Sequence, residues 1–172
     1  MILETIQTVL LALVLYLAID TVVARVQVDK ISMEPTLHAG EFILVNKLAY
    51  RFGSVERGDI IVFHYPLNPS EDYIKRVIGL PGDVVRVQNG NVYVNSQQLE
   101  EPYISAPPVY EGQWVVPDEK IFVLGDNRNQ SSDSHEWGFV PYGNIVGRAM
   151  VIYWPLNDFR VLNESFVVSA AP

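Results

Sequence analysis

The sequence around two residues, Ser32 and Lys75, suggests that they could act as a nucleophile and a base. Ser32 lies in the segment VDKISMEPTL (28–37), just after an apolar N-terminal stretch, and Lys75 lies in the strand-like segment YIKRVIGLPGD (73–83). A third segment, GDNRNQSSDS (125–134), is dense in small polar residues. A serine hydroxyl is a weak nucleophile that needs a base within hydrogen-bond reach. The sequence therefore raises the question of whether Lys75 is that base.

A lysine general base needs a special environment. Its ordinary pKa is about 10.4, so bringing it to about 7 disfavours the ammonium form by about 4–5 kcal/mol. Burial can produce such a shift. On a strand, Lys75 would share one face with Val77 and Gly79, and the adjacent charge of Arg76 would act in the same direction. Taken singly, however, Lys75 is more typical of a surface lysine, and Ser32 of a cap before the helical turn at Pro35.

A histidine could also serve as the base. The chain has His38, His64 and His135, so a Ser-His-Asp triad is compatible with its composition. The chain has no Gly-x-Ser-x-Gly elbow, which removes the usual signature of that triad in hydrolases. There is no cysteine, which excludes a thiolate nucleophile, a disulfide and Cys-ligated zinc.

The bulk composition narrows the class of partner. A chain of 172 residues accommodates one domain with a core and a short appendage. Its net charge of −8 argues against nucleic acid, which requires a basic face. His38 and His64 lack the spacing of metal ligands, so we expect no metal and no other cofactor.

The N-terminal segment is almost wholly apolar from Ile6 to Val23. A membrane-spanning helix needs about 17–25 residues, so we predict a single transmembrane anchor over 1–24. A cleaved signal peptide is disfavoured, because no Lys or Arg precedes the segment and no clear small-x-small site follows it. A buried core helix is the third interpretation. Arg25 and Lys30, on the C-terminal side, would alone place the rest of the chain in the cytoplasm.

The remaining chain predicts a mainly β domain. Short apolar runs and period-2 alternation, punctuated by eleven Gly and eleven Pro, favour antiparallel, coiled or barrel-like sheets over 25–160. Asn89-Gly90 between two alternating runs indicates a type I′ hairpin, within a small β insertion at about 89–116. Residues 161–172 are expected to form a C-terminal tail. Further strands are predicted at 42–45, 60–63, 83–88, 91–94, 120–124 and 145–154.

The three polar segments occur in a fixed order after the apolar stretch, and together they resemble the type I signal peptidases of bacteria and organelles. The segments are SMEPTL (32–37), YIKRVIGLPGD (73–83) and GDNRNQSSDS (125–134), and the resemblance covers nearly the whole chain. It implies a mainly β domain on the outer face of a membrane. The implied activity is the removal of signal peptides from exported preproteins after a small-x-small motif such as Ala-x-Ala.

The resemblance also implies roles for single residues. Ser32 takes the position of the nucleophile, Lys75 that of the general base, and Ser131 that of a hydroxyl that orients the lysine. Arg76, Asp126, Asp133 and His135 would be structural residues near the site, with Asp126 pairing with Arg76. By position, the residues expected to contact the small substrate side chains are Val28, Met33, Leu37 and Ile74.

Two residues depart from the family pattern. Many relatives carry Ser or Gly two residues before the nucleophile, where this chain has Lys30, and the oxyanion contact of that Ser cannot be transferred. Where relatives often have Arg paired with the equivalent of Asp133, this chain has His135, which could form a hydrogen bond instead. Whether Lys30 contributes to the oxyanion site is left open by the sequence.

The expected partners are signal-peptide-bearing preproteins and the lipid bilayer of a plasma or internal membrane, crossed once. Two alternatives remain at this level. A self-cleaving, repressor-type Ser-Lys protease would share the dyad, but the anchor and the lack of a DNA-binding module disfavour it. A non-catalytic, membrane-tethered β module that binds peptides would retain the fold with a lapsed active site.

Overall fold

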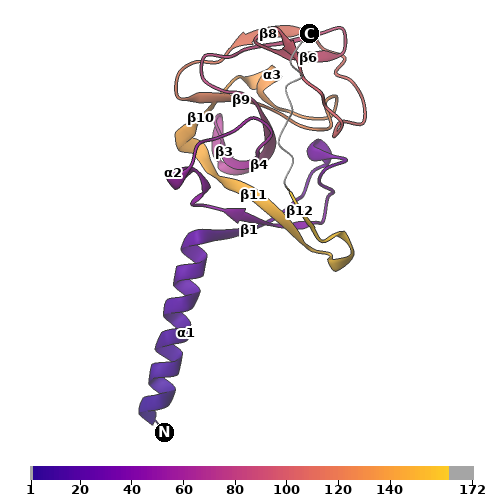
Figure 1. Ribbon diagram of the computed structural model, residues 1–172. Helices are drawn as coiled ribbons and strands as arrows, with labels where there is room; N and C mark the ends of the chain where they lie inside the picture. Colours follow the sequence, from indigo (N-terminus) through magenta and orange to yellow (C-terminus); the bar gives the residue numbers. More distant parts are fainter. Residues whose placement is uncertain (1, 163–172) are drawn as a thin grey trace.

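A long N-terminal helix projects from a β-rich body in the computed structural model, which describes residues 2–162 (Figure 1). This helix, α1 (Ile2–Val22), has 21 residues, and none of them is buried. At 1.5 Å per residue its length is about 31 Å, close to the thickness of about 30 Å of a bilayer's hydrocarbon core. The segment is long and apolar enough to cross a membrane. The alternative of a buried core helix is wrong for the described residues 2–162, because no residue of α1 is buried among them.

The body consists of two antiparallel sheets. The larger one has the strand order β1-β2-β11-β3-β4-β9-β10, with β12 added to β11, and the smaller one has the order β7-β6-β5-β8. The strands of the larger sheet are β1 (Val23–Gln27), β2 (Phe42–Asn46), β3 (Ile60–Tyr65), β4 (Asn68–Gly79), β9 (Lys120–Leu124), β10 (Val140–Pro141), β11 (Ile145–Trp154) and β12 (Arg160–Val161). Those of the smaller sheet are β5 (Val84–Gln88), β6 (Asn91–Val94), β7 (Gln97–Gln98) and β8 (Gly112–Val115).

The prediction of a mainly β, antiparallel domain is confirmed. The larger sheet is not a closed barrel, because within residues 2–162 its terminal strands β1 and β10 do not pair with each other. The smaller sheet lies at the end of the body farthest from α1 (Figure 1). After α1, the helical elements within residues 2–162 are short turns: η1 (Ile31–Met33), α2 (Ala49–Phe52), α3 (Ser134–Trp137), η2 (Tyr142–Asn144) and η3 (Leu156–Asp158).

The predicted hairpin is present between β5 and β6. Asn89 and Gly90 both have positive φ, 51° and 76°, and the flanking pair is Gln88 with Asn91. Both central residues of a type I′ turn need positive φ, which explains the Asn-Gly pair. The smaller sheet begins at Val84, before the insertion expected at 89–116, because β5 is its central partner. Of the predicted tail 161–172, residues 163–172 lie outside the described part of the chain.

The second half of β4 is enclosed by the body of the protein. From Lys75 to Gly79 every residue of β4 is buried. This is because β3 pairs along one edge as far as Arg76, β9 pairs along the other from Arg76 to Gly79, and apolar cores cover both faces. One apolar core contains Val28, Met33 and Leu37, and it lies beside Ile74. Any charged side chain on this part of β4 is therefore removed from solvent.

Candidate active site

Ser32 lies in the short 3-10 turn η1, between β1 and β2. Met33, the last residue of this turn, is 1% exposed and packs in the same core as Val28, which fixes the turn on the body. From the side, the amide of Asn127 donates to the carbonyl of Ser32 at 3.1 Å, and its side chain donates to the carbonyl of Ile31 at 3.2 Å. The third polar segment thus holds the turn that carries the serine.

Lys75 reaches Ser32 from β4. Its Nζ lies 2.8 Å from Ser32 Oγ and donates to the carbonyl of Ile74 at 2.9 Å. Lys75 is only 4% exposed, which rules out the interpretation as a surface lysine. An activated serine nucleophile needs a base within hydrogen-bond distance of its hydroxyl, and the buried amine of Lys75 meets this requirement.

Burial is the main influence on Lys75. It lowers the pKa of Lys75 to about 8; the nearby carboxylates of Asp133 and Asp126 oppose this, and the charge of Lys30 reinforces it. The sequence suggested Arg76 as the helpful cation, but Arg76 is engaged by Asp126. The cation that lowers the pKa of Lys75 is instead Lys30.

A buried ion pair lies beneath the site. Arg76 donates to both carboxylate oxygens of Asp126, with Nε to Oδ1 at 2.8 Å and NH2 to Oδ2 at 2.6 Å, and both side chains are fully buried. The hydroxyl of Thr36 donates to Oδ2 of the same carboxylate at 2.5 Å. The predicted pairing of Asp126 with Arg76 is confirmed, and it ties β4 to the segment after Ser32 and to the start of the third polar segment.

Asp133 links the end of the third polar segment to its beginning. Its carboxylate accepts from the amide of Gly125 at 2.9 Å and contacts Nδ1 of His135 at 2.6 Å. Burial disfavours the charged imidazole, but the hydrogen bond and charge of Asp133 outweigh it, so the pKa of His135 is raised. The hydrogen bond expected between His135 and Asp133 is therefore present, and the ring of Tyr110 stacks on His135 with 3.9 Å between centroids.

Ser131 lies beside the dyad without bonding to it. It is 7% exposed, and its Oγ has no hydrogen-bond partner among the described residues. A Cβ added at Gly125 would come within 2.2 Å of that Oγ and 2.4 Å of the carbonyl oxygen of Ser32. Ser131 is therefore a neighbour of Ser32, but its predicted role of orienting Lys75 stays a prediction.

A groove of about 640 Å³ opens at the dyad. Two segments form most of its lining: 26–33, which runs from the end of β1 through η1, and 72–75 of β4. Each has a backbone edge without a strand partner in the described chain: β1 ends the larger sheet, and β9 pairs with β4 only from Arg76 onward. The groove can therefore receive an extended peptide along either edge.

Three of the four residues expected to contact substrate line this groove, namely Val28, Met33 and Ile74. Leu37, the fourth, does not: it is fully buried in the core beneath, because the turn after Pro35 directs it inward. Sequence reasoning missed Tyr73, Gln130 and Ser132, which also line the groove. The sequence offered one signal for these residues: Tyr73 lies in the same segment as Lys75, and Gln130 and Ser132 flank Ser131.

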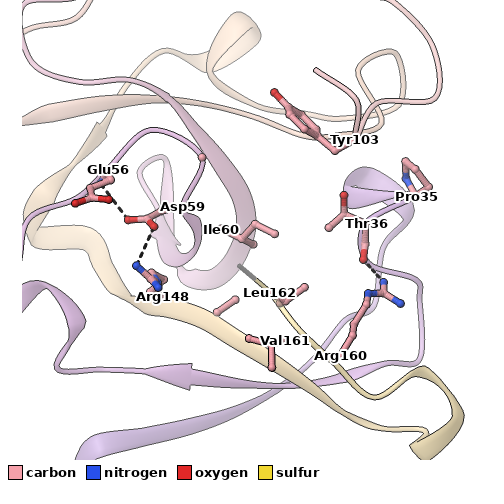
Figure 2. Close-up of a pocket in the computed structure, with 12 residues that line it drawn as sticks. Pro35, Thr36, Glu56, Asp59, Ile60, Tyr103, Arg148, Arg160, Val161 and Leu162 are labelled. Atoms are coloured by element: carbon pink, nitrogen blue, oxygen red, sulfur yellow. Dashed lines mark hydrogen bonds and ion pairs between the residues drawn. The ribbon is translucent and has the colours of Figure 1, made fainter. Parts of the chain in front are cut away.

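A second pocket, of about 400 Å³, is lined by Pro35 and Thr36 together with residues from other parts of the chain, among them Asp59, Arg148 and Leu162 (Figure 2). Arg148 pairs with Asp59 at 3.2 Å, Asp59 accepts from the backbone amide of Glu56 at 3.0 Å, and Arg160 donates to the carbonyl of Thr36. Neither Ser32 nor Lys75 lines it. The groove at the dyad is therefore the candidate active site.

Comparisons with known proteins show the family to which the chain belongs. A family model described as "Signal peptidase, peptidase S26" matches residues 2–154. The "Signal peptidase I" of Leptolyngbya laminosa is 50% identical over 163 residues, which cover 90% of this chain and 80% of that protein. The "Probable signal peptidase I-2" of Synechocystis sp. is 48% identical over 169 residues, covering 94% and 78% respectively. A crystal structure of a signal peptidase I from Enterococcus faecalis V583 matches with a TM-score of 0.52 and 32% identity, covering 55% of this chain and 96% of that chain.

Proposed function

Because this chain belongs to the signal peptidase family, peptidase S26, we propose that it is a membrane-anchored endopeptidase that removes signal peptides from preproteins after a small-x-small motif. Ser32 is the nucleophile and Lys75 the general base. The observation that carries this proposal is the 2.8 Å contact between Ser32 Oγ and the buried Nζ of Lys75. The alternative of a lapsed, peptide-binding module gives no reason to keep a buried lysine aimed at a serine.

The reaction begins with neutral Lys75. Its lone pair takes the proton of Ser32 as Oγ attacks the scissile carbonyl carbon. The oxyanion accepts from the backbone N–H of Ser32, which has no intrahelical acceptor because it lies in the first turn of η1. The resulting ammonium of Lys75 then gives its proton to the leaving amine, and an acyl-enzyme ester remains. Water, activated by the same amine, hydrolyses the ester and restores Ser32.

The two N–H groups of neutral Lys75 need acceptors if its lone pair is to face Ser32. One donates to the carbonyl of Ile74. We assign the other to Ser131, and its buried hydroxyl, which has no partner among the described residues, supports this assignment. In that arrangement Ser131 orients the amine but takes no part in bond making or breaking.

Substrate binding follows from the shape of the groove. An extended signal peptide adds to the free edges of β1 and of β4 at 72–75, with backbone hydrogen bonds supplying affinity. Val28, Met33 and Ile74 contact the small side chains that precede the scissile bond. Val28 and Met33 are buried and Ile74 is partly buried, so the contact surface is shallow and favours Ala over larger side chains.

The apolar N-terminal helix and the family together suggest how the protein is placed in a membrane. Residues 1–24 anchor the protein, residues 25–160 form the peptidase domain, and the domain lies on the extracytoplasmic side of a plasma or internal membrane. Exported preproteins present their cleavage sites on that side. Two basic residues after the helix, Arg25 and Lys30, are weak opposing evidence, and Lys30 also lines the groove.

The pH dependence of cleavage tests the function and the base together. The full chain in detergent should cleave a preprotein with an Ala-x-Ala site, and kcat/KM should rise through about pH 8 to a plateau. The sign follows from the mechanism, because the ammonium form of Lys75 cannot accept a proton and predominates below its pKa. A preprotein with Leu in place of the last Ala is the control and should remain uncut.

Other profiles would contradict this proposal. A rise centred near pH 6.5 would indicate a histidine base. Absence of cleavage at every pH by folded protein that still binds the peptide would favour the non-catalytic module.

Gly125 offers a test of how tightly the site is built. Gly125→Ala should lower kcat/KM by about 10²-fold, since its Cβ would displace the Ser32 carbonyl and the Ser131 hydroxyl, and small misplacements of reacting groups have costs of this size. The matched control is Gly143→Ala, whose Cβ would meet nothing within 4 Å. Equal activity of the two variants would show that the packing around Gly125 does not position Ser32.

A further inference from the structure

Lys30 occupies an unusual place in the groove. It caps the N-terminus of η1 two residues before Ser32, is exposed, and lines the groove together with Ser32 and Lys75. Its side chain makes no capping hydrogen bond. Within the described chain no carboxylate forms an ion pair with it, although Asp29 and Asp72 line the same groove. Its charge is therefore not neutralised by a salt bridge.

The ring of Tyr73 holds Lys30 near the base. Lys30 Nζ lies 4.9 Å from the centroid of this ring, and Lys75 Nζ lies 5.3 Å from the same centroid. The two nitrogens are thus no more than about 10 Å apart, the sum of those distances. The electron-rich face of a tyrosine ring attracts ammonium groups, so Tyr73 gives a flexible lysine a preferred position.

We propose that Lys30 is a positioning residue whose charge, held on the Tyr73 ring, favours the neutral, proton-accepting form of Lys75. The proposal rests on the function proposed above and deepens it. Two like charges at this distance repel each other, and the repulsion is relieved when Lys75 loses its proton. Lys30 itself neither touches the reacting atoms nor exchanges a proton.

Two carboxylates near Lys75 favour its charged form, and Lys30 acts against them. Asp133 and Asp126 both raise the pKa of Lys75, against the effect of burial. Asp126 is neutralised by Arg76, and Asp133 is shared by His135 and the amide of Gly125. Lys30 is the cation that directly lowers the pKa of Lys75. It therefore offsets the carboxylates that the fold needs beneath the site.

A second role for Lys30 would leave a different kinetic signature. A donor to the oxyanion contributes to the rate at every pH, and its removal costs about 10²–10³-fold on the plateau. A residue that acts on Lys75 moves the pH midpoint and leaves the plateau in place. The two roles can therefore be separated by one pH profile.

The kinetic experiment compares Lys30→Met with the wild type from pH 6 to 10 at low ionic strength, where exposed charges are least screened. The midpoint of kcat/KM should rise by about 0.3–1 unit, the range expected for charges about 10 Å apart at surface dielectric values. At pH 7 the rate should consequently fall about 2–10-fold, with the plateau within twofold of the wild type. Lys30→Arg should keep the wild-type midpoint, as should the control Lys120→Met at the exposed first residue of β9.

A readout without catalysis makes the test independent of the proposed function. The chain has only four lysines, so ¹³C-labelled lysine gives a side-chain NMR spectrum in which Lys75 can be assigned by its loss in Lys75→Met. The titration midpoint of Lys75 should rise in Lys30→Met and stay unchanged in Lys120→Met. An unchanged midpoint in Lys30→Met would overturn the inference, as would a lowered plateau with an unmoved pH midpoint. If the protein proved inactive, the NMR midpoint would still decide the role of Lys30.

Discussion

Replacing Ser32 with alanine is expected to lower kcat/KM for an Ala-x-Ala preprotein by at least about 10⁴-fold, and Lys75→Met should cost about as much. Nucleophile and base act as one unit, because Oγ is reactive only while its proton is being removed. The double variant should therefore lose little more than either single variant. Cleavage rates in detergent at pH 9, with product masses determined by mass spectrometry, measure this effect.

The histidines supply the control for this prediction. None of the three lines the groove, and His64 instead contacts Asp72 at 2.7 Å on the exposed part of β4. His64→Gln should therefore cleave at close to the wild-type rate. Substantial cleavage by folded Lys75→Met, lost again when a histidine is replaced, would place the base elsewhere and refute the Ser-Lys mechanism.

Arg76→Met is expected to cause the largest loss of stability, about 3–5 kcal/mol of unfolding free energy. It leaves the carboxylate of Asp126 fully buried without its counter-ion, with the Thr36 hydroxyl as its remaining side-chain donor. For a domain of this size the thermal midpoint should fall by roughly 10 °C. Thermal unfolding of the full chain, followed by circular dichroism in detergent, provides the measurement.

The matched control removes both charges at once. Arg76→Met combined with Asp126→Leu has no uncompensated buried charge, so it should be markedly more stable than Arg76→Met alone. If the single variant were as stable as the wild type, Asp126 could not depend on Arg76 for compensation. If the double variant were no better than the single one, steric loss rather than charge would explain the effect.

Much of the fold follows from local patterns. The type I′ turn at Asn89-Gly90 was predictable because few residue pairs accept two positive φ values in succession. The strands at 42–45, 120–124 and 145–154 were predictable because their apolar runs are short and bounded by turn residues. The strand β1, directly after α1, was missed because its apolar residues merge with the preceding helical segment.

The candidate site was less accessible to sequence reasoning. Period-2 alternation assigns opposite faces to Lys75 and Arg76 but does not say that both faces are covered. Leu37 was misplaced for a related reason, since position near the nucleophile does not reveal whether a side chain points to the groove or to the core. The buried, unbonded hydroxyl of Ser131 and the lining residues Gln130 and Ser132 depend on how one loop folds over another.

The sequence by itself determined the family, the reactive residue types and the mainly β class, because these depend on local strings and their order along the chain. Only the tertiary structure decided that Lys75 is buried and aimed at Ser32. It also decided that Asp126 pairs with Arg76, and that Lys30 and Lys75 both lie against the Tyr73 ring. The physical reason is that burial and charge–charge interaction depend on distances between segments more than 40 residues apart in the chain, and no local pattern records those distances.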